Sequence, residues 1–393
     1  MRPLDGVTVI TLEHAIAAPF ATRQLADLGA RVIKIERPGV GDFARGYDER
    51  VHGLASHFVW TNRSKESLTL DVKHPEAQII LKRLIVESAD VVIQNLAPGA
   101  AARLGLSYAA LSAEKPGIIV CDISGYGEDG PYRDKKAYDL LIQSESGFVS
   151  VTGTPEEPAK AGLSIADIAA GMYAYANILA ALLHRQKTGR GQHIDVSMLE
   201  SLVEWMSFPL YYAFDGAAPP SRAGASHATI YPYGPVPAGD GKIVMLGLQN
   251  EREWAAFCDK VLLDPALATE ARFSTNSKRS AARVELRALI VAAFSSLTAE
   301  EVVARLDAAQ IANARVNTMH DVWNHPQLSA RKRWREVGTA AGSIPALLPP
   351  GSWEEGPPRM DAVPALGEHT DAILGGLGYS KERIAALRAE KAI

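Results

Sequence analysis

The stretch from Pro158 to Ser201 reads PAKAGLSIADIAAGMYAYANILAALLHRQKTGRGQHIDVSMLES. Nearly every side chain from Ile168 to Leu183 is small or apolar, which predicts a buried helix. Lys187 and then Gly189 supply the basic last turn and the glycine stop that are typical of a helix C-terminus. Asp167 is therefore expected at or near the N-terminus of this helix, where backbone N–H groups and the helix dipole stabilise a carboxylate or a bound anion.

Two roles fit Asp167. The simpler one is a helix N-cap, since aspartate is among the residues favoured there. The other is a reactive group at a ligand site, because a lone acid in apolar surroundings is poorly placed for solvent. The rest of the chain decides between the two.

The chain before this stretch alternates between strand-like and helical segments. Val7 to Leu12 and Val32 to Glu36 read as strands on either side of a helical pattern from Pro19 to Leu28, which predicts a β-α-β unit. The alternation continues through a helix at Pro75 to Glu87, strands at Ala89 to Gln94, Gly117 to Ile123 and Gln192 to Val196, and a helix at Met198 to Tyr212. This order predicts an α/β fold with a mostly parallel sheet. Because no GxGxxG follows the first strand, the fold is Rossmann-like without the dinucleotide fingerprint.

A second, smaller α+β domain is expected after a Gly-, Ala- and Pro-rich linker. The predicted organisation is a large domain at 1–215, the linker at 216–228, the small domain at 229–320, and a return segment at 321–393 that completes the large domain. Asp240-Gly241 between short apolar runs predicts a hairpin. Helices are expected at Glu251 to Leu262, Ala281 to Ser296, Ala299 to Ala308 and Lys381 to Ala389, with an irregular proline-rich path between about Asp321 and the last helix.

Composition indicates an ordinary soluble enzyme. The 393 residues are 47% hydrophobic and 22% charged, with a formal net charge of −4, so we expect no general attraction to nucleic acid or anionic membranes. No apolar run reaches the length of a transmembrane helix, and the N-terminus lacks a signal-peptide pattern. Cys121 and Cys258 lie in apolar surroundings without metal-ligand spacing, which predicts buried free thiols and a cytoplasmic location.

Basic residues recur at predicted strand ends: Lys34, Arg37, Lys65, Lys73, Arg103, Lys135 and Lys136. If the sheet brings these loops to one edge, they form a cleft suited to a ligand that carries phosphate. The alternative is a set of solvated surface cations. His14 closely follows the first strand, before an expected helix N-terminus at the same edge, although a lone histidine there is more often a satisfied turn residue than a catalyst. The chain shows none of the motifs of serine hydrolases, zincins or P-loop enzymes, and no metal is expected.

Several ordered motifs resemble those of the class III CoA-transferases, a family that also contains CoA-linked racemases. They are LADLGARVIKIERPGVGD, NRSKESLTLDVKHPEA, QNLAPGAAARLGL, AYDLLIQSESG, GLSIADIAAGMYA, TGRGQHIDVSMLES and LGEHTDAILGGLGYS. They run from the first strand to the end of the chain.

The resemblance implies an interlocked homodimer, coenzyme A as part of the substrate, and Asp167 as the catalytic residue. The positions implied to contact CoA are His14, Arg37, Leu70, Lys73, Asn95, Arg103 and Lys136. Tyr138 and Asp139 match positions that flank the active site. The implied chemistry is attack of Asp167 on an acyl-CoA thioester, formation of an aspartyl-CoA thioester and transfer to an acceptor acid, with helix N–H groups stabilising the oxyanions.

The sequence leaves alternatives open for both the substrate and the reaction type. The formyl-CoA:oxalate transferases carry a run of glycines where this chain has RAGASHATIYPYG, and the racemases carry Gly-His-Asp where it has Ala137-Tyr138-Asp139. A racemase or epimerase, an oxalate-type transferase and a non-catalytic acyl-CoA binding protein remain as alternatives. The resemblance implies succinyl-CoA as a common donor, and similarity over LEHAIAAPFATRQLADLGARVIKIERPGVGDFARGYD suggests the itaconate, mesaconate or citramalate branch. Arg45, beside Tyr47, is the predicted cation for a distal carboxylate, although it could instead pair with Asp42 or contact CoA.

Overall fold

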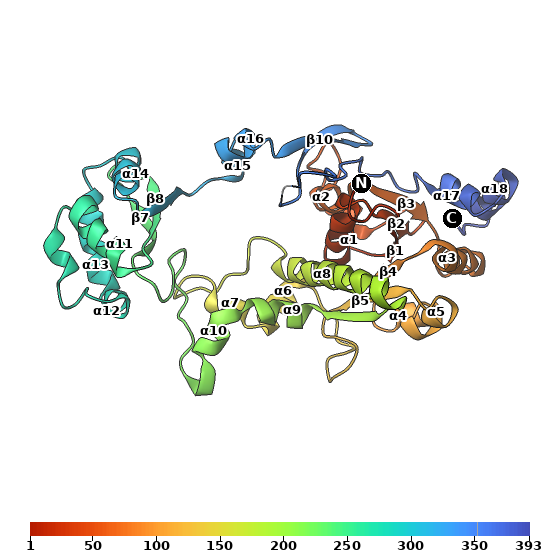
Figure 1. The fold of residues 1–393 in the computed structure, drawn as a ribbon, viewed down its shortest axis with the longest axis horizontal. Coiled ribbons are helices and arrows are strands. Elements are labelled where there is room, and N and C mark those ends of the chain that lie inside the picture. Colours follow the sequence, from red (N-terminus) through yellow and green to blue (C-terminus); the bar gives the residue numbers. More distant parts are fainter. Residues whose placement is uncertain (352) are drawn as a thin grey trace. The chain divides into compact units, whose positions relative to one another are not determined.

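A computed structural model describes residues 1–351 and 353–393, and the chain forms two compact units (Figure 1). The first unit comprises Met1–Gly147, Ala161–Met206 and Gln327–Ile393. The second comprises Phe148–Lys160 and Ser207–Pro326. The main part of the second unit therefore begins at Ser207, before the linker expected at 216–228. This unit also includes residues 148–160, which were expected in the first domain.

The first unit is built on a six-stranded sheet in the order β3-β2-β1-β4-β5-β6. Its strands are β1 (Thr8–Leu12), β2 (Arg31–Glu36), β3 (Lys65–Thr69), β4 (Val91–Gln94), β5 (Ile119–Ser124) and β6 (His193–Ser197). All five pairings are parallel, which confirms the expected sheet. The chain runs outward from β1 toward β3 on one side and toward β6 on the other. The switch point between β1 and β4 is where sheets of this order bind ligands, beyond the strand ends.

Helices cover both faces of this sheet. Residues of one strand parity, such as Ile33 and Ile35, pack with α3 (Pro75–Ser88), α17 (Thr370–Gly376) and α18 (Lys381–Ala389). The opposite face lies toward α1 (Ala17–Asp27) and α8 (Ile165–Thr188), which run close together (Figure 1). Further elements of this unit are η1 (Phe43–Gly46), α2 (Ser56–Asn62), α4 (Ala100–Arg103), α5 (Tyr108–Glu114), α6 (Asp139–Glu145) and α9 (Met198–Trp205).

Gly171 lets α1 and α8 approach closely. A Cβ added there would lie 2.7 Å from the carbonyl oxygen of Ala17, so a larger residue would push the two helices apart. Gly171 is one turn after Asp167, and α8 begins at the same sheet edge as α1 because both helices run antiparallel to the strands. The packing therefore places the start of α8 beside the start of α1, next to the switch point.

By length and composition alone, α8 is apolar enough to cross a membrane, so the expectation that no segment reaches that length is wrong. The helix packs against α1, α9 and β5 in this unit, and core helices of soluble proteins pass the same test. A cytoplasmic location stays a prediction.

The segment after residue 326 is more regular than its prolines predict. It holds α16 (Pro326–Ala330) and an antiparallel hairpin of β10 (Trp334–Thr339) and β11 (Gly342–Leu347). The LGEHT motif then closes the edge of β3: the N–H of His369 donates to the Ser67 carbonyl at 3.0 Å, and Thr370 Oγ1 accepts from the Thr69 N–H at 3.0 Å. Covering an edge strand protects its free backbone groups.

The second unit holds a three-stranded antiparallel sheet of β7 (Tyr233–Pro237), β8 (Ile243–Gly247) and β9 (Ala312–Arg315). Gly241, with φ of 78°, makes the turn between β7 and β8, which confirms the hairpin. The other elements are α7 (Phe148–Val151), α10 (Ser207–Tyr212), η2 (Phe214–Gly216), α11 (Glu251–Ala256), η3 (Phe257–Val261), η4 (Pro265–Ala268), α12 (Asn276–Ala281), α13 (Arg283–Phe294), α14 (Ala299–Ala308) and α15 (Met319–Trp323). The helix expected from Met198 to Tyr212 breaks at Ser207, whose φ is 44°.

Cys121 and Cys258 are both buried and free, as expected. Burial raises the pKa of each thiol, to about 12 for Cys258. Both thiols therefore stay protonated and act as small core side chains.

Candidate active site

Asp167 is the third residue of α8 and does not cap it. Ser164 occupies the N-cap position without a side-chain cap bond. The first N–H groups are instead satisfied by Asp139, whose Oδ1 accepts from the Ala166 N–H at 2.8 Å and from the Asp167 N–H at 3.3 Å. The N-cap role for Asp167 is therefore wrong. These two N–H groups are also not free to stabilise an oxyanion in this arrangement.

Asp139 is itself held in place. Its Oδ2 accepts from Nε2 of the buried Gln143 at 2.7 Å, and the Gln143 Oε1 accepts from the Ala161 N–H at 2.8 Å. The result is a fixed carboxylate that caps the helix beside a second carboxylate that does not. Sequence similarity placed Asp139 at this site, but the capping bond could not be foreseen because it joins residues 27 and 28 positions apart.

The environment of Asp167 makes its carboxylate basic. Burial, with a further contribution from the negative charge of Asp139, raises the pKa of Asp167 to about 7. Among residues 1–351 and 353–393 its side chain has no hydrogen-bond or ion-pair partner. An unpaired, half-buried carboxylate with a raised pKa is typical of a functional group rather than a structural one.

His14 and Asn95 meet at the switch point. His14 follows β1 and Asn95 follows β4, and their groups bond reciprocally: the His14 N–H donates to Asn95 Oδ1 at 2.9 Å, and Asn95 Nδ2 donates to the His14 carbonyl at 2.9 Å. The amide of Asn95 is thus used to hold the loop after β1. Its predicted contact with CoA is an additional role that remains a prediction.

A row of aromatic rings extends from His14 toward Asp167. His14 stacks on Phe43 with centroids 5.2 Å apart, and Phe43 contacts Tyr47 at 5.8 Å. Burial first, and then the charges of Asp42 and Asp167, raise the pKa of Tyr47 to about 12, so its phenol stays protonated as a hydrogen-bond donor. Tyr138, at the N-cap of α6, is 70% exposed. Both predicted tyrosines therefore present surface near the reactive carboxylate.

Four of the predicted CoA contacts are exposed cations without an anionic partner. They are Arg37 after β2, Lys73 after β3, Arg103 in α4 after β4, and Lys136 after β5. None has an ion pair with another residue in the part of the chain that the structure describes. Because they follow successive parallel strands, they lie along the carboxyl edge of the sheet.

Other cations that the sequence placed in this cleft are buried and paired. Lys34 and Lys65 have fully buried side chains that bind Glu13. They point to the inner face because residues of one strand parity share a face. The expectation that Lys34 and Lys65 line a cleft is therefore wrong. Lys135, which was also expected there, forms a surface ion pair with Glu145.

Arg45 is also engaged. Its Nε and Nη2 donate to the two oxygens of Glu36 at 2.8 and 2.7 Å, and Nη1 donates to the Pro364 carbonyl at 3.3 Å. The guanidinium lies 3.8 Å from the ring centre of Phe58. Its partner is thus Glu36 and not Asp42, and the dicarboxylate clamp stays a prediction without support from this pairing.

Leu70 differs in kind from the other predicted CoA contacts. Its side chain is 1% exposed in the core, and its N–H donates to the Glu36 carbonyl at 2.8 Å. Any contact with a ligand would therefore come from its backbone carbonyl.

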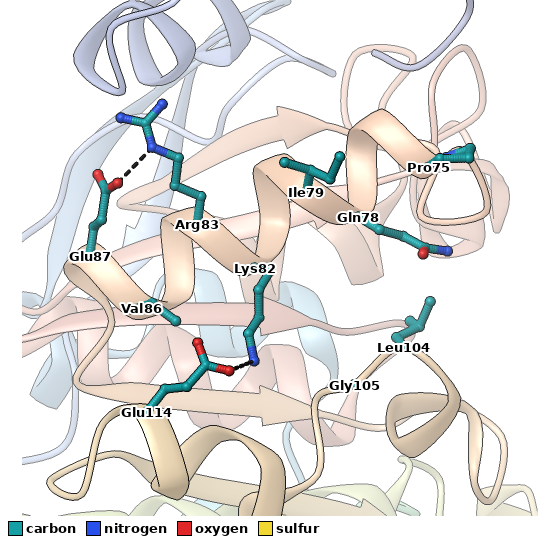
Figure 2. Close-up of a pocket in the computed structure, with 10 residues that line it drawn as sticks. All are labelled: Pro75, Gln78, Ile79, Lys82, Arg83, Val86, Glu87, Leu104, Gly105 and Glu114. Carbon is teal, nitrogen blue, oxygen red and sulfur yellow. Dashed lines mark hydrogen bonds and ion pairs between the residues drawn. The ribbon is translucent and has the colours of Figure 1, made fainter.

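A groove of about 670 Å³ lies along the outside of α3, against the α4–α5 region (Figure 2). Its lining residues are Pro75, Gln78, Ile79, Lys82, Arg83, Val86, Glu87, Leu104, Gly105 and Glu114. Figure 2 shows its lysine and arginine already paired, Lys82 with Glu114 at 2.6 Å and Arg83 with Glu87 at 2.6 Å. The groove does not include Asp167, but two of its lining residues are close in sequence to Lys73 and Arg103.

One group of side chains within the described residues has the geometry to hold a metal ion. Asp122, Glu128 and His193 place one possible ligand atom each within 4.8 Å of the others. His193 Nε2 lies 2.7 Å from Asp122 Oδ2, so this cluster is also satisfied as an ion pair. The absence of a metal requirement stays a prediction.

The site thus combines a basic carboxylate at a helix start, a sheet switch point and a line of unpaired cations. These features are typical of α/β enzymes that act on an anionic, phosphate-bearing substrate. The family model of CoA-transferase family III matches residues 4–370, so the chain belongs to CoA-transferase family III.

Curated relatives cover nearly the whole chain. A succinate–glutarate CoA-transferase of Agrobacterium fabrum is 35% identical over 95% of this chain and 96% of its own length. An acetyl-CoA:oxalate CoA-transferase of Acetobacter aceti is 35% identical over 94% and 95%, and a succinyl-CoA–D-citramalate CoA-transferase of Chloroflexus aurantiacus is 32% identical over 100% and 98%. The oxalate and glutarate enzymes are equally similar, so identity alone does not separate their substrates.

Solved structures agree with this assignment. A CaiB/BaiF family protein from Brucella suis is 34% identical, with a TM-score of 0.83 over 96% of this chain and 99% of that one. The likeness extends over both units of the chain.

The raised pKa of Asp167 predicts a pH-dependent stability effect. Because the pKa is higher in the folded than in the unfolded chain, ionisation of Asp167 destabilises the folded state. This destabilisation is absent below about pH 4, where the carboxyl is largely protonated in both states, and it is fully present above the folded pKa of about 7. Asp167→Asn should therefore raise the midpoint of thermal unfolding near about pH 8 and not near about pH 4. Each unit of raised pKa corresponds to about 1.4 kcal/mol, which partial exposure reduces.

The matched control is Asp129→Asn, at an exposed aspartate in the loop after β5. This variant should shift the midpoint equally little at both pH values. An Asp167→Asn effect of the same size at both pH values would contradict the assignment of a raised pKa.

Proposed function

We propose that the protein transfers CoA reversibly between an acyl-CoA and a short carboxylic acid, with Asp167 as the nucleophile. The observation that carries this proposal is the unpaired, basic carboxylate of Asp167 beside a capping Asp139, at a sheet edge with unpaired cations. Membership of CoA-transferase family III supports the reaction class. A carboxylate nucleophile suits acyl exchange because it forms an anhydride that a thiolate opens again.

The proposed reaction proceeds in paired exchanges. A carboxylate oxygen of Asp167 attacks the thioester carbonyl, and the CoA thiolate leaves to give a mixed anhydride. The thiolate then attacks the aspartyl carbonyl, which releases the donor acid and leaves an aspartyl-CoA thioester. The acceptor carboxylate attacks this thioester, expels the thiolate and forms a second anhydride. Attack of the thiolate on the acceptor carbonyl makes the new acyl-CoA and restores Asp167.

Protein groups near Asp167 have distinct parts in this scheme. Asp139 keeps the start of α8 fixed and helps to keep Asp167 basic. The protonated phenol of Tyr47 is a hydrogen-bond donor that an acyl or carboxylate oxygen could accept from. Tyr138 supplies an exposed wall for the substrate acid.

CoA is proposed to lie along the carboxyl edge of the sheet. The four unpaired cations give its phosphates charged partners, and His14 lies at the switch point among them. The groove, whose lining residues Pro75 and Leu104 are close in sequence to Lys73 and Arg103, offers an apolar surface at Ile79, which is 57% exposed (Figure 2). This arrangement would leave the thioester end of the ligand near Asp167.

For the acid, we propose a short dicarboxylate, with succinyl-CoA as donor. The relatives from Agrobacterium and Chloroflexus are named for succinate with glutarate and succinyl-CoA with citramalate, which supports this class. Itaconate and mesaconate belong to the same chemical class. One methylene or methyl changes binding by only about 1–3 kcal/mol, so several such acids could serve as acceptors.

We also propose that the protein is a homodimer. Large apolar side chains remain exposed on α6, α8 and α9: Tyr138 70%, Leu140 47%, Leu141 47%, Leu183 59% and Trp205 39%. Exposed apolar surface of this extent on neighbouring elements is typical of an interface. A second copy of the chain is the proposed partner.

The substrate class is tested with a panel of acceptors and succinyl-CoA. Glutarate, citramalate and itaconate should accept CoA, butyrate should be a poor acceptor, and Asp167→Ala should abolish every transfer. Formation of each acyl-CoA is measured by liquid chromatography. Equal rates for butyrate and the diacids would contradict the dicarboxylate preference, and solvent deuterium at the α-carbon without acyl exchange would indicate a racemase instead.

The same panel run on Arg45→Ala separates the two roles of that residue. Selective loss of the diacids would support a clamp. A loss of all acids alike, with a lower unfolding midpoint, would assign Arg45 to its ion pair with Glu36.

The placement of CoA is tested with two neighbouring lysines. Lys136 is unpaired, whereas Lys135 is paired with Glu145. Lys136→Ala should raise the KM for acyl-CoA about tenfold or more, since a charge-assisted phosphate contact is worth about 1.5–3 kcal/mol. Lys135→Ala is the matched control and should leave KM within about twofold. Equal effects of the two substitutions would refute the placement.

A further inference from the structure

A network of four buried charged side chains lies beneath the loop that carries His14. Lys65 Nζ lies 2.6 Å from Glu13 Oε1, and Lys34 Nζ lies 3.3 Å from the same oxygen. Lys34 Nζ also lies 2.8 Å from Asp42 Oδ2. All four side chains have 0% exposure, and they comprise two carboxyl groups and two amino groups. Burial lowers the pKa of Lys65 to about 7, against the attraction of Glu13.

Further hydrogen bonds hold the network together. Glu13 Oε2 accepts from the hydroxyls of Thr11 at 2.9 Å and Thr22 at 2.6 Å, and Lys65 donates to Asn62 Oδ1 at 3.1 Å. Burial alone would raise the pKa of Glu13, but the attraction of Lys65 and Lys34 lowers it to about 2. The carboxylate therefore stays ionised.

A network of this kind is poorly explained by stability alone. Buried ion pairs are often no more stabilising than apolar residues of the same volume, because removing the charges from water costs as much as their attraction returns. The network also contacts the loop after β1, and Asp42 is the member that makes this contact.

Asp42 contacts that loop at Ala15 and His14, and it also caps η1 at Ala44. Its Oδ1 accepts from the Ala15 N–H at 3.1 Å and from the Ala44 N–H at 2.9 Å, and it lies 3.8 Å from Nδ1 of His14. Ala15 has φ of 61°, a left-handed conformation that costs energy in a residue with a Cβ. Such a conformation persists where surrounding contacts impose it. The bond to Asp42 is one such contact.

The same carboxylate faces one edge of the His14 ring. Nδ1 is buried and has no hydrogen-bond partner within the described residues, while the side chain as a whole is 31% exposed. Because Nδ1 faces Asp42, Nε2 is the ring nitrogen left for a ligand. Stacking on Phe43, which follows Asp42 directly, holds the ring plane.

We propose that Asp42 is a positioning residue that acts through His14, holding the ring so that Nε2 faces bound CoA. Lys34, Glu13 and Lys65 support Asp42 from beneath and keep its charge balanced. This inference rests on the proposed function, because it takes His14 to contact CoA. It goes beyond that function by assigning a purpose to a buried network that does not touch the ligand.

The test is a double-mutant cycle read as the Kd for CoA by calorimetry. His14→Ala and Asp42→Asn should each weaken CoA binding about tenfold, and Asp42→Asn should change Kd by less than about twofold in the His14→Ala background. Equal effects of Asp42→Asn in both backgrounds would overturn the proposal. An unchanged Kd for His14→Ala would also overturn it. In that case, binding of CoA by the wild type would still support the transferase assignment. Loss of CoA binding by the wild type would refute the proposed function itself.

Two further variants separate positioning from folding. The double variant Lys34→Met with Asp42→Asn removes one charge of each sign. Its midpoint of thermal unfolding should therefore be higher than that of Asp42→Asn alone, while its binding of CoA stays as weak as that of Asp42→Asn. Recovery of Kd together with the midpoint would show a structural role only. Asp27→Asn is the matched control, since Asp27 is a buried carboxylate bound to Arg23 and Arg63 at the other end of α1. It should lower the midpoint and leave Kd unchanged.

Discussion

The capping of α8 by Asp139 is the interaction on which the site depends. The start of a helix carries several N–H groups that need partners, and an acid within the first turn is an obvious candidate. Here Asp139 supplies that partner from another helix. Asp167 therefore remains unpaired, and the nearby negative charge together with burial makes it basic. If Asp167 capped its own helix, its carboxylate would be stabilised and its pKa would fall.

The sheet supplies the second constraint. Because all six strands are parallel, each strand end delivers its following loop to one edge, and the reversal of order at β1 opens a place between two of those loops. At this point the backbone of His14, after β1, and the side chain of Asn95, after β4, are joined by two hydrogen bonds. Gly171 then lets α8 approach α1, so that the carboxylate of Asp167 lies at the sheet edge that also carries the unpaired cations.

Sequence patterns could predict the elements that depend on local order. The β-α-β unit, the parallel sheet, the hairpin at Gly241 and the last helix follow from apolar periodicity and turn residues. The strand β3 was not predicted because its sequence KESLT is mostly polar although the strand is largely buried. The β10–β11 hairpin was not predicted because its mostly exposed side chains give no clear period. Ion-pair partners also could not be read from the sequence: Lys34 was expected at the sheet edge, yet strand parity turns its side chain inward to Glu13. A charged residue inside an otherwise apolar strand, as in VIKIE, is the signal that could have indicated this network.

In the proposed reaction Asp167 forms a covalent intermediate with CoA. The direct measurement is peptide mass spectrometry after brief incubation with succinyl-CoA, with and without hydroxylamine. We predict an adduct of CoA on the peptide that contains Asp167, its conversion by hydroxylamine to a hydroxamate, and its absence in Asp167→Ala. CoA transfer that proceeds while Asp167 stays unmodified, or with the adduct on a different residue, would contradict the account.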